Sequence, residues 1–241
     1  MTTSILEERI KQVYQGFFEK MGINSRTGIS KYVSKYGRLK FGTYPFIGSK
    51  YGQKPPILFV GLDLGKDESR NKILGFNIKR KVVEGMNDCL TSMNPQISGL
   101  YTSAIFFLER KHWKEIGNEI SNKAGVRKFL NLRRINLLCY VALTNLFKYV
   151  TEGRTNRTGG NDRRHFSEEQ ELQLLLNEIR ILNPHIIVLQ SRHFLHKKYT
   201  KFLEKLKNQN KRRKIYVIPH PASRYRGSRS PEKYICQLQK L

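Results

Sequence analysis

Three polar residues whose side chains suit bond cleavage each follow a short apolar segment of the chain. They are Asp63, Asn145 and His220. A carboxylate can orient a water molecule and stabilise positive charge, an imidazole can donate to developing negative charge, and an amide donates and accepts hydrogen bonds at once. Each residue also has a structural interpretation: a helix cap for Asp63, a strand-end cap for Asn145, and for His220 a turn held rigid by Pro221. Together the three suit a reaction that leaves opposite charges on the two parts of a cleaved bond.

Short apolar runs bounded by prolines or polar residues predict the elements that would position these side chains. Four buried parallel strands are predicted, at residues 57–60, 137–143, 185–189 and 215–218. Helices are predicted at residues 78–93, 168–182, 194–206 and from Pro231 onward. This alternation predicts an α/β fold, a three-layer α/β/α sandwich with a central four-stranded parallel sheet. Since parallel strands share a carboxyl edge, we expect the three polar residues on one rim.

An N-terminal extension, residues 1–54, is predicted to precede and pack on an α/β domain of residues 55–241. Residues 4–21 predict an amphipathic helix. Residues 26–54 hold seven basic residues, no acidic one and six interleaved aromatic residues. This composition suits phosphate contact and base stacking, and equally an irregular layer whose aromatic side chains pack inward.

Two of these polar segments resemble motifs of the uracil-DNA glycosylase superfamily. They are Gly61-Leu-Asp-Leu-Gly65 and His220-Pro-Ala-Ser223, with Asn145 between them. The first motif of the superfamily has the form Gly-x-(Asp/Asn/Ala)-Pro-(Tyr/Gly), and its last is His-Pro-(Ser/Gly) after the final strand. Phe76 lies where the classical uracil branch places the aromatic residue that stacks on the base. The resemblance covers the chain from about residue 41 onward.

The resemblance implies a monofunctional DNA glycosylase, which flips a base out of DNA and hydrolyses its N-glycosidic bond. Asp63 would orient a water molecule and stabilise the cationic sugar, and His220 would donate to O2 of the leaving base. Phe76 would stack on the flipped base, and Asn145 would read its polar edge. The family inserts a wedge into the duplex after the histidine, where this chain has Ser223, Arg224, Tyr225 and Arg226.

At two positions this chain lacks the residues with which the family excludes a base that carries a substituent at C5. The classical branch has a tyrosine two residues after the aspartate, where this chain has Gly65. Another branch has a glutamate directly after the first glycine, where this chain has Leu62. The expected substrate is therefore uracil or a C5-modified pyrimidine, such as a modified cytosine of viral DNA. The expected role is correspondingly DNA repair or antiviral defence.

The charge balance indicates a polyanionic partner. The chain has 45 Lys and Arg against 19 Asp and Glu, a net charge of +26, which favours nucleic acid. We expect single- or double-stranded DNA as the partner and a monomeric protein. No apolar run approaches the roughly 18 residues of a membrane span, and the first residues do not resemble an export signal. The expected location is therefore cytoplasmic.

Three widely spaced cysteines predict buried thiols in a reducing compartment. They are too few for the four-cysteine iron–sulfur cluster of some glycosylase branches, so no cofactor or metal is expected. The alternative to an enzyme is a non-catalytic nucleic-acid-binding protein that keeps the same fold. Asp63 together with His220 favours the enzyme, because a site without chemistry has no physical need for either residue.

Overall fold

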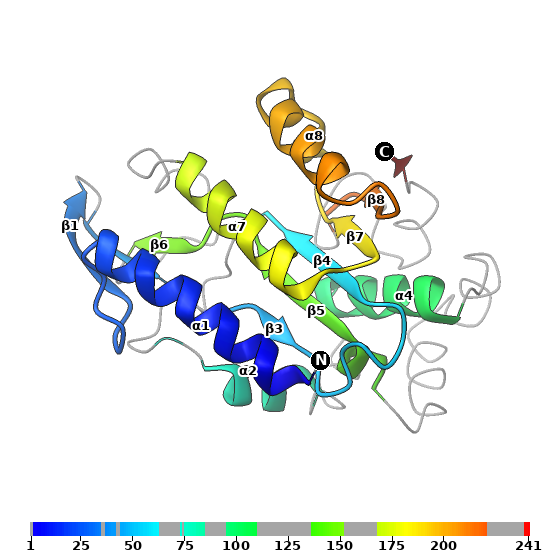
Figure 1. Cartoon of the computed structure of the whole chain (residues 1–241), viewed down its shortest axis with the longest axis horizontal. Helices are drawn as coiled ribbons and strands as arrows, with labels where there is room; N and C mark the ends of the chain where they lie inside the picture. Colours follow the sequence, from blue (N-terminus) through cyan, green and yellow to red (C-terminus); the bar gives the residue numbers. More distant parts are fainter. Residues whose placement is uncertain are drawn as a thin grey trace.

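The computed structural model describes most of the chain, which forms a central β-sheet with helices packed against it (Figure 1). The described residues are 2–34, 37–41, 44–62, 73, 75–84, 95–109, 136–151, 168–220 and 239–241. The sheet is mainly parallel, so the prediction of a mixed α/β protein is confirmed.

The central sheet has six strands in the order β3-β5-β4-β7-β8-β9. They are β3 (Phe46–Ile47), β4 (Ile57–Gly61), β5 (Val141–Asn145), β7 (Ile186–Leu189), β8 (Lys214–Val217) and β9 (Gln239–Lys240). Strands β4, β5, β7 and β8 are parallel, as predicted, while β3 and β9 pair antiparallel at the two edges. The prediction of a four-stranded sheet is therefore wrong. Each added strand has only two residues, too few to leave a period-two pattern in the sequence.

The second parallel strand begins later than its apolar run. Residues Leu137–Tyr140 form the 3-10 helix η2. Asn136 caps its amino end, where the Asn136 side chain accepts a hydrogen bond of 2.9 Å from the Leu138 backbone N–H. Strand β5 follows at Val141 and includes Asn145, so this candidate residue ends the strand instead of following it. A buried 3-10 turn and a buried strand both have a continuous run of apolar residues, so the sequence pattern could not distinguish one from the other.

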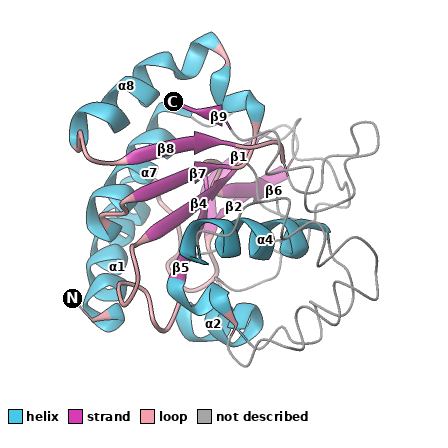
Figure 2. Ribbon diagram, turned by 90° about the vertical axis from the view of Figure 1, so that its right-hand side faces the viewer, coloured by secondary structure: helices cyan, strands magenta, loops and turns pink. Residues whose placement is uncertain are grey.

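Helices cover both faces of the sheet and give the predicted three layers (Figure 2). One face carries α1 (Thr3–Lys20), α7 (Glu168–Leu182) and α8 (Thr200–Gln209), and the other carries α2 (Phe76–Glu84) and α4 (Pro95–Glu109). Helix α7 matches its prediction. The predicted helix 194–206 is instead two 3-10 turns, η4 (Arg192–Leu195) and η5 (Lys197–Tyr199), before α8. The end of the predicted helix 78–93, and the helix predicted from Pro231, lie outside the described residues.

Alternate residues of the parallel strands enter two separate hydrophobic cores. On the side of α1, α7 and α8, the core includes Val60 and Leu189; on the side of α2 and α4, it includes Phe59 and Val188. This alternation follows from the pleat of a β-strand. All residues of β4 are buried, because the strand is covered on both faces.

The order of the parallel strands creates a topological switch point between β4 and β7. From β4 the chain crosses to β5 through the layer of α2 and α4. It then returns past β4 to β7 through α7, on the opposite face (Figure 2). In open α/β sheets, ligands bind outside the carboxyl ends of the strands at such a point. The fold therefore predicts a ligand-binding site beyond the carboxyl ends of β4 and β7.

The N-terminal part of the chain packs onto the sheet through α1, which lies against α7 (Figure 1). A three-stranded antiparallel sheet follows, made of β1 (Ile29–Ser34), β2 (Gly37–Phe41) and β6 (Tyr149–Thr151). Strand β6 falls within residues 148–164, which the sequence predicts as a surface loop because they hold three glycines, Lys148 and four arginines. Three aromatic residues of the basic segment, Phe41, Phe46 and Tyr51, are buried, which favours the interpretation that they pack inward. None of the described helices is long and apolar enough to cross a membrane.

Candidate active site

The candidate site lies at the carboxyl edge of the parallel strands. Leu62 directly follows β4, Asn145 is the last residue of β5, and His220 lies three residues beyond Val217, the end of β8. Strand β7 separates β4 from β8. The structure thus brings three of the predicted site residues to one edge. Asp63, Gly65 and the predicted wedge, residues 223–226, lie outside the described residues.

The ends of β4 and β5 are held in close contact. Gly61 and Asn145 are register partners, and Asn145 Oδ1 occupies the space that a β-carbon on residue 61 would need. Just beyond the strands, the backbone N–H groups of Leu146 and Phe147 donate to the carbonyl oxygens of Gly61 (2.9 Å) and Leu62 (3.0 Å). A glycine at position 61 is therefore what allows the Asn145 amide to lie across the end of β4.

Phe76 lies at the start of α2 and is 6% exposed. Its ring stacks on Tyr44, with centroids 5.0 Å apart and an angle of 22° between the ring planes. Tyr44 lies two residues before β3, and both Phe76 and Tyr44 belong to the hydrophobic core on the side of α1 and α7. The Phe76 ring is therefore buried in that core, with Tyr44 covering one of its faces.

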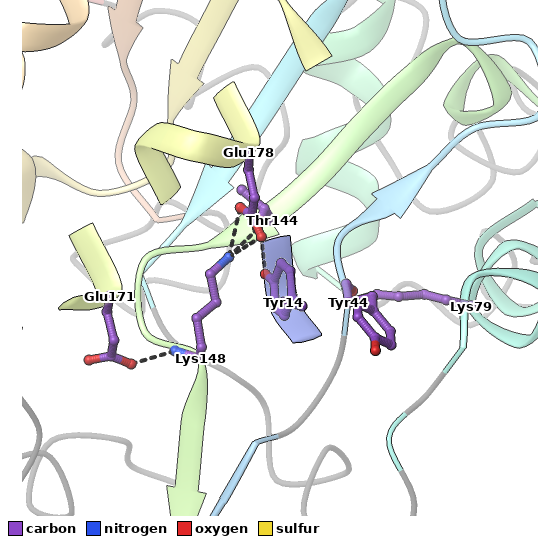
Figure 3. A network of polar contacts seen from close by, with 7 residues as sticks. All are labelled: Tyr14, Tyr44, Lys79, Thr144, Lys148, Glu171 and Glu178. Carbon is purple, nitrogen blue, oxygen red and sulfur yellow. Dashed lines mark hydrogen bonds and ion pairs between the residues drawn. The ribbon is translucent and has the colours of Figure 1, made fainter. Parts of the chain in front are cut away.

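A buried polar network supports the end of β5 from the α1 and α7 side (Figure 3). Lys148 Nζ lies 2.8 and 2.9 Å from the two carboxylate oxygens of Glu178 on α7, and it also donates to Thr144 Oγ1 on β5. Thr144 Oγ1 in turn donates to Glu178 at 2.7 Å. The Tyr14 hydroxyl on α1 donates to the same carboxylate, and the Lys148 backbone N–H donates to Glu171 at 2.7 Å.

Burial governs the acid–base properties of this network. Side chains of Lys148 and Glu178 are 2% and 1% exposed. Burial lowers the pKa of Lys148, and the neighbouring Glu178 and Glu171 carboxylates oppose this change. Burial, reinforced by the Glu178 charge, raises the pKa of Tyr14 well above its usual value. Because Thr144 and Lys148 lie on either side of Asn145 in sequence, the network fixes the backbone that carries the Asn145 amide.

Two features of the site were missed by the sequence interpretation. Lys148 was predicted in a surface loop, yet its side chain is buried, and no local pattern indicated this because its partner Glu178 is 30 residues away. Gln190 directly follows the buried strand β7 at the switch point. It meets the same criterion that selected Asp63, a polar residue immediately beyond a buried strand, and could have been found in that way.

A strongly basic segment begins at the rim and continues through α8. Residues 192–214 contain ten Lys and Arg against a single acidic residue, Glu204. The exposed basic residues in it are Arg192, Lys197, Lys198, Lys201, Lys205, Lys207, Lys211, Arg212 and Lys214. Such a surface attracts polyanions, and it starts directly after Gln190 and Ser191.

No group of three or more His, Cys, Asp or Glu side chains in the described ranges is arranged to hold a metal ion. His193 and His196, which form an H-x-x-H pair, have ring centroids 6.0 Å apart. Cys139 is buried as predicted, and burial raises the pKa of its thiol to about 11. Cys89 and Cys236 lie outside the described residues.

Fold and rim together define an α/β protein with a mainly parallel sheet and a candidate ligand site at its carboxyl edge. No family model, curated protein or solved structure matches this chain. Its function is therefore argued from the residues and geometry of the site itself.

Proposed function

We propose that this protein is a DNA glycosylase that resembles the uracil-DNA glycosylase superfamily in its chemistry. It flips a base out of DNA and hydrolyses the N-glycosidic bond, which leaves an abasic site. The observation that carries the proposal is the common edge of the sheet at which Leu62, Asn145 and His220 lie, because three segments far apart in sequence lead to it. The net charge of +26 supports nucleic acid as the substrate.

In the proposed reaction, the bond between sugar C1′ and the base nitrogen breaks, and the base leaves with the electron pair. A water molecule adds to C1′ and gives up a proton, while the base takes up a proton, so the products are an abasic sugar and a free base. Asp63 orients the water and stabilises the positive charge on the sugar. His220 donates a hydrogen bond to O2 of the leaving base, where negative charge develops.

The base pocket is proposed to include Asn145, Phe76, Leu62 and Gly65. The Asn145 amide reads the polar edge of the base, because it donates and accepts hydrogen bonds together. The Phe76 ring stacks on the base, and its contact with Tyr44 holds the ring in place. Leu62 and Gly65 stand where other branches of the superfamily exclude C5 substituents. The substrate is thus uracil or a C5-modified pyrimidine, such as a modified cytosine of viral DNA.

DNA contact is assigned to the start of the segment 192–214, which begins at the rim, and to the residues that follow His220. The exposed side chains of Arg192, Lys197, Lys198 and Lys201 neutralise backbone phosphates. Ser223, Arg224, Tyr225 and Arg226 follow His220 closely and enter the duplex where the base has left it. A non-catalytic DNA-binding protein would use the same surface and leave the DNA intact. Cleavage of incubated DNA by alkali, which breaks the chain at abasic sites, separates the two functions.

Binding to DNA is expected to weaken steeply with salt, because lysine and arginine side chains displace condensed counterions. A plot of log affinity against log salt concentration should have a slope that corresponds to several neutralised phosphates. Replacing both Lys198 and Lys201 with glutamine should reduce that slope by about one for each phosphate that is no longer neutralised. Lys11→Gln, on helix α1, is the matched control and should leave the slope unchanged. An affinity nearly independent of salt would contradict the assigned surface.

Gly61→Ala is expected to reduce base release by about tenfold or more, because a small displacement of a positioning group has a large effect on rate. The new methyl group meets Asn145 Oδ1, the far end of a side chain that can rotate away. Stability should therefore change little. Gly48→Ala is the contrasting variant, since its methyl group meets the Cys139 backbone carbonyl and should destabilise the fold. Parental base release by a folded Gly61→Ala protein would show that Asn145 does not read the base.

A further inference from the structure

Gln190 and Asn145 flank Gly61 at the carboxyl edge of the sheet. Gly61 is the register partner of Asn145 on one side. On the other side, Val60 is paired with Leu189, and the Gln190 backbone N–H donates to the Val60 carbonyl oxygen at 2.8 Å. Three neighbouring strands therefore end in the row Asn145, Gly61, Gln190. This row spans the switch point between β4 and β7.

The pleat places this row on the face of the sheet that α2 and α4 cover. Val60 and Leu189 lie in the core on the α7 side, so Gly61 and Gln190, one residue further along, face the other way. Thr144 bonds to Glu178 of α7, so Asn145 also faces away from α7. The alternation continues past the strand ends, since Ile218, one residue beyond β8, lies in the core on the α2 and α4 side.

The Gln190 side chain is buried, and its amide nitrogen has no hydrogen-bond partner among the described residues. The residue is 6% exposed, and its Nε2 makes no hydrogen bond to any part of the chain that the structure describes. A buried donor of this kind is unfavourable for folding, because it has lost water and gained nothing in return. Groups left unsatisfied at a topological switch point indicate a ligand that supplies the missing acceptor.

We propose that Gln190 is a specificity-determining residue, which binds the polar edge of the base from the side opposite Asn145. This inference rests on the proposed function. Gly61 has no side chain, so residue 61 places nothing between the two amides. Neighbouring strands lie about 4.8 Å apart, so the backbones that carry the two amides are about 10 Å apart. Asn145 Oδ1 already lies over Gly61, so the base lies beyond the end of β4, where the two amides offer it donors and acceptors from either side.

Gln190→Met tests this role, because methionine has nearly the same length and volume but cannot form the hydrogen bonds. Gln170→Met is the matched control, since Gln170 on α7 also has a buried amide atom, Oε1, with no hydrogen bond among the described residues. Binding of free uracil, cytosine and hypoxanthine is measured by calorimetry, and the thermal midpoint is measured alongside. We expect Gln190→Met to weaken binding of the preferred base by about tenfold and to keep or raise the midpoint. Gln170→Met should leave base binding unchanged.

Each outcome of this experiment supports or overturns the role of Gln190. Parental base affinity in Gln190→Met overturns the inference, as does a parent chain that binds none of the three bases. A lower midpoint with unchanged base binding shows that Gln190 is structural, and also overturns it. A parent that binds a base but releases none from DNA contradicts the proposed function, while weaker binding by Gln190→Met in the same experiment still supports this residue's role.

Discussion

Lys148→Met is expected to lower the free energy of unfolding by about 3–5 kcal/mol, the usual result of removing one partner from a buried ion pair. Methionine fills much of the same volume but leaves the Glu178 carboxylate buried without its cation. The carboxylate is 1% exposed, so water cannot compensate. Urea unfolding followed by circular dichroism would measure the change.

Two further variants separate the charge effect from packing. Lys148→Met combined with Glu178→Gln removes both charges, while the glutamine amide can still accept from the Tyr14 hydroxyl and donate to Thr144 Oγ1, so at least half of the lost stability should return. Lys11→Met removes an exposed lysine 3.4 Å from Glu8 and should cost about 0.5 kcal/mol or less. A loss in Lys148→Met as small as that of Lys11→Met would show that the network does not stabilise the end of β5.

Asp63→Asn and His220→Ala are each expected to slow base release by about 100- to 1000-fold while leaving DNA affinity nearly unchanged. The asparagine keeps the shape of the aspartate but lacks the negative charge that stabilises the cationic sugar. The alanine removes the donor to the leaving base. Single-turnover assays with excess protein would measure the chemical step without product release.

His185→Ala is the matched control for His220→Ala. His185 is exposed and precedes β7, so it lies at the amino edge of the sheet, opposite the candidate site. Its replacement should leave base release unchanged. Normal turnover in both site variants would contradict the assignment, whereas failure of both to fold would support the structural interpretations of Asp63 and His220.

The parallel strands and α7 were predictable from the sequence because burial on both faces gives a continuous apolar run and burial on one face gives a 3.6-residue period. The short edge strands β3 and β9 were not, because their pairing depends on neighbours distant in sequence. The same reason applies to Lys148. Its partner Glu178 is 30 residues away, and nothing local distinguishes a buried lysine from a solvated one.

The candidate site was predictable only where a polar residue follows an apolar run. That rule selected Asp63 and His220, and it also fits Gln190, which belongs to no motif of the superfamily quoted above. The role of Gly61 as the space for the Asn145 amide depends on the register of β4 and β5, which no sequence pattern reveals. Phe76 was chosen by its distance from Asp63, and its contact with Tyr44 became visible only in three dimensions.

The most direct test of the central claim is base release by the parental chain from a panel of DNAs. The panel contains uracil, hypoxanthine, and plain or glycosylated 5-hydroxymethylcytosine in otherwise identical single- and double-stranded oligonucleotides. Free base is quantified by mass spectrometry, and abasic sites by alkali cleavage, with Asp63→Asn as the negative control. We predict release of at least one base with an equal yield of abasic sites, and little or none with Asp63→Asn. Tight binding to every DNA of the panel with no base released would contradict the claim and identify a non-catalytic DNA-binding protein.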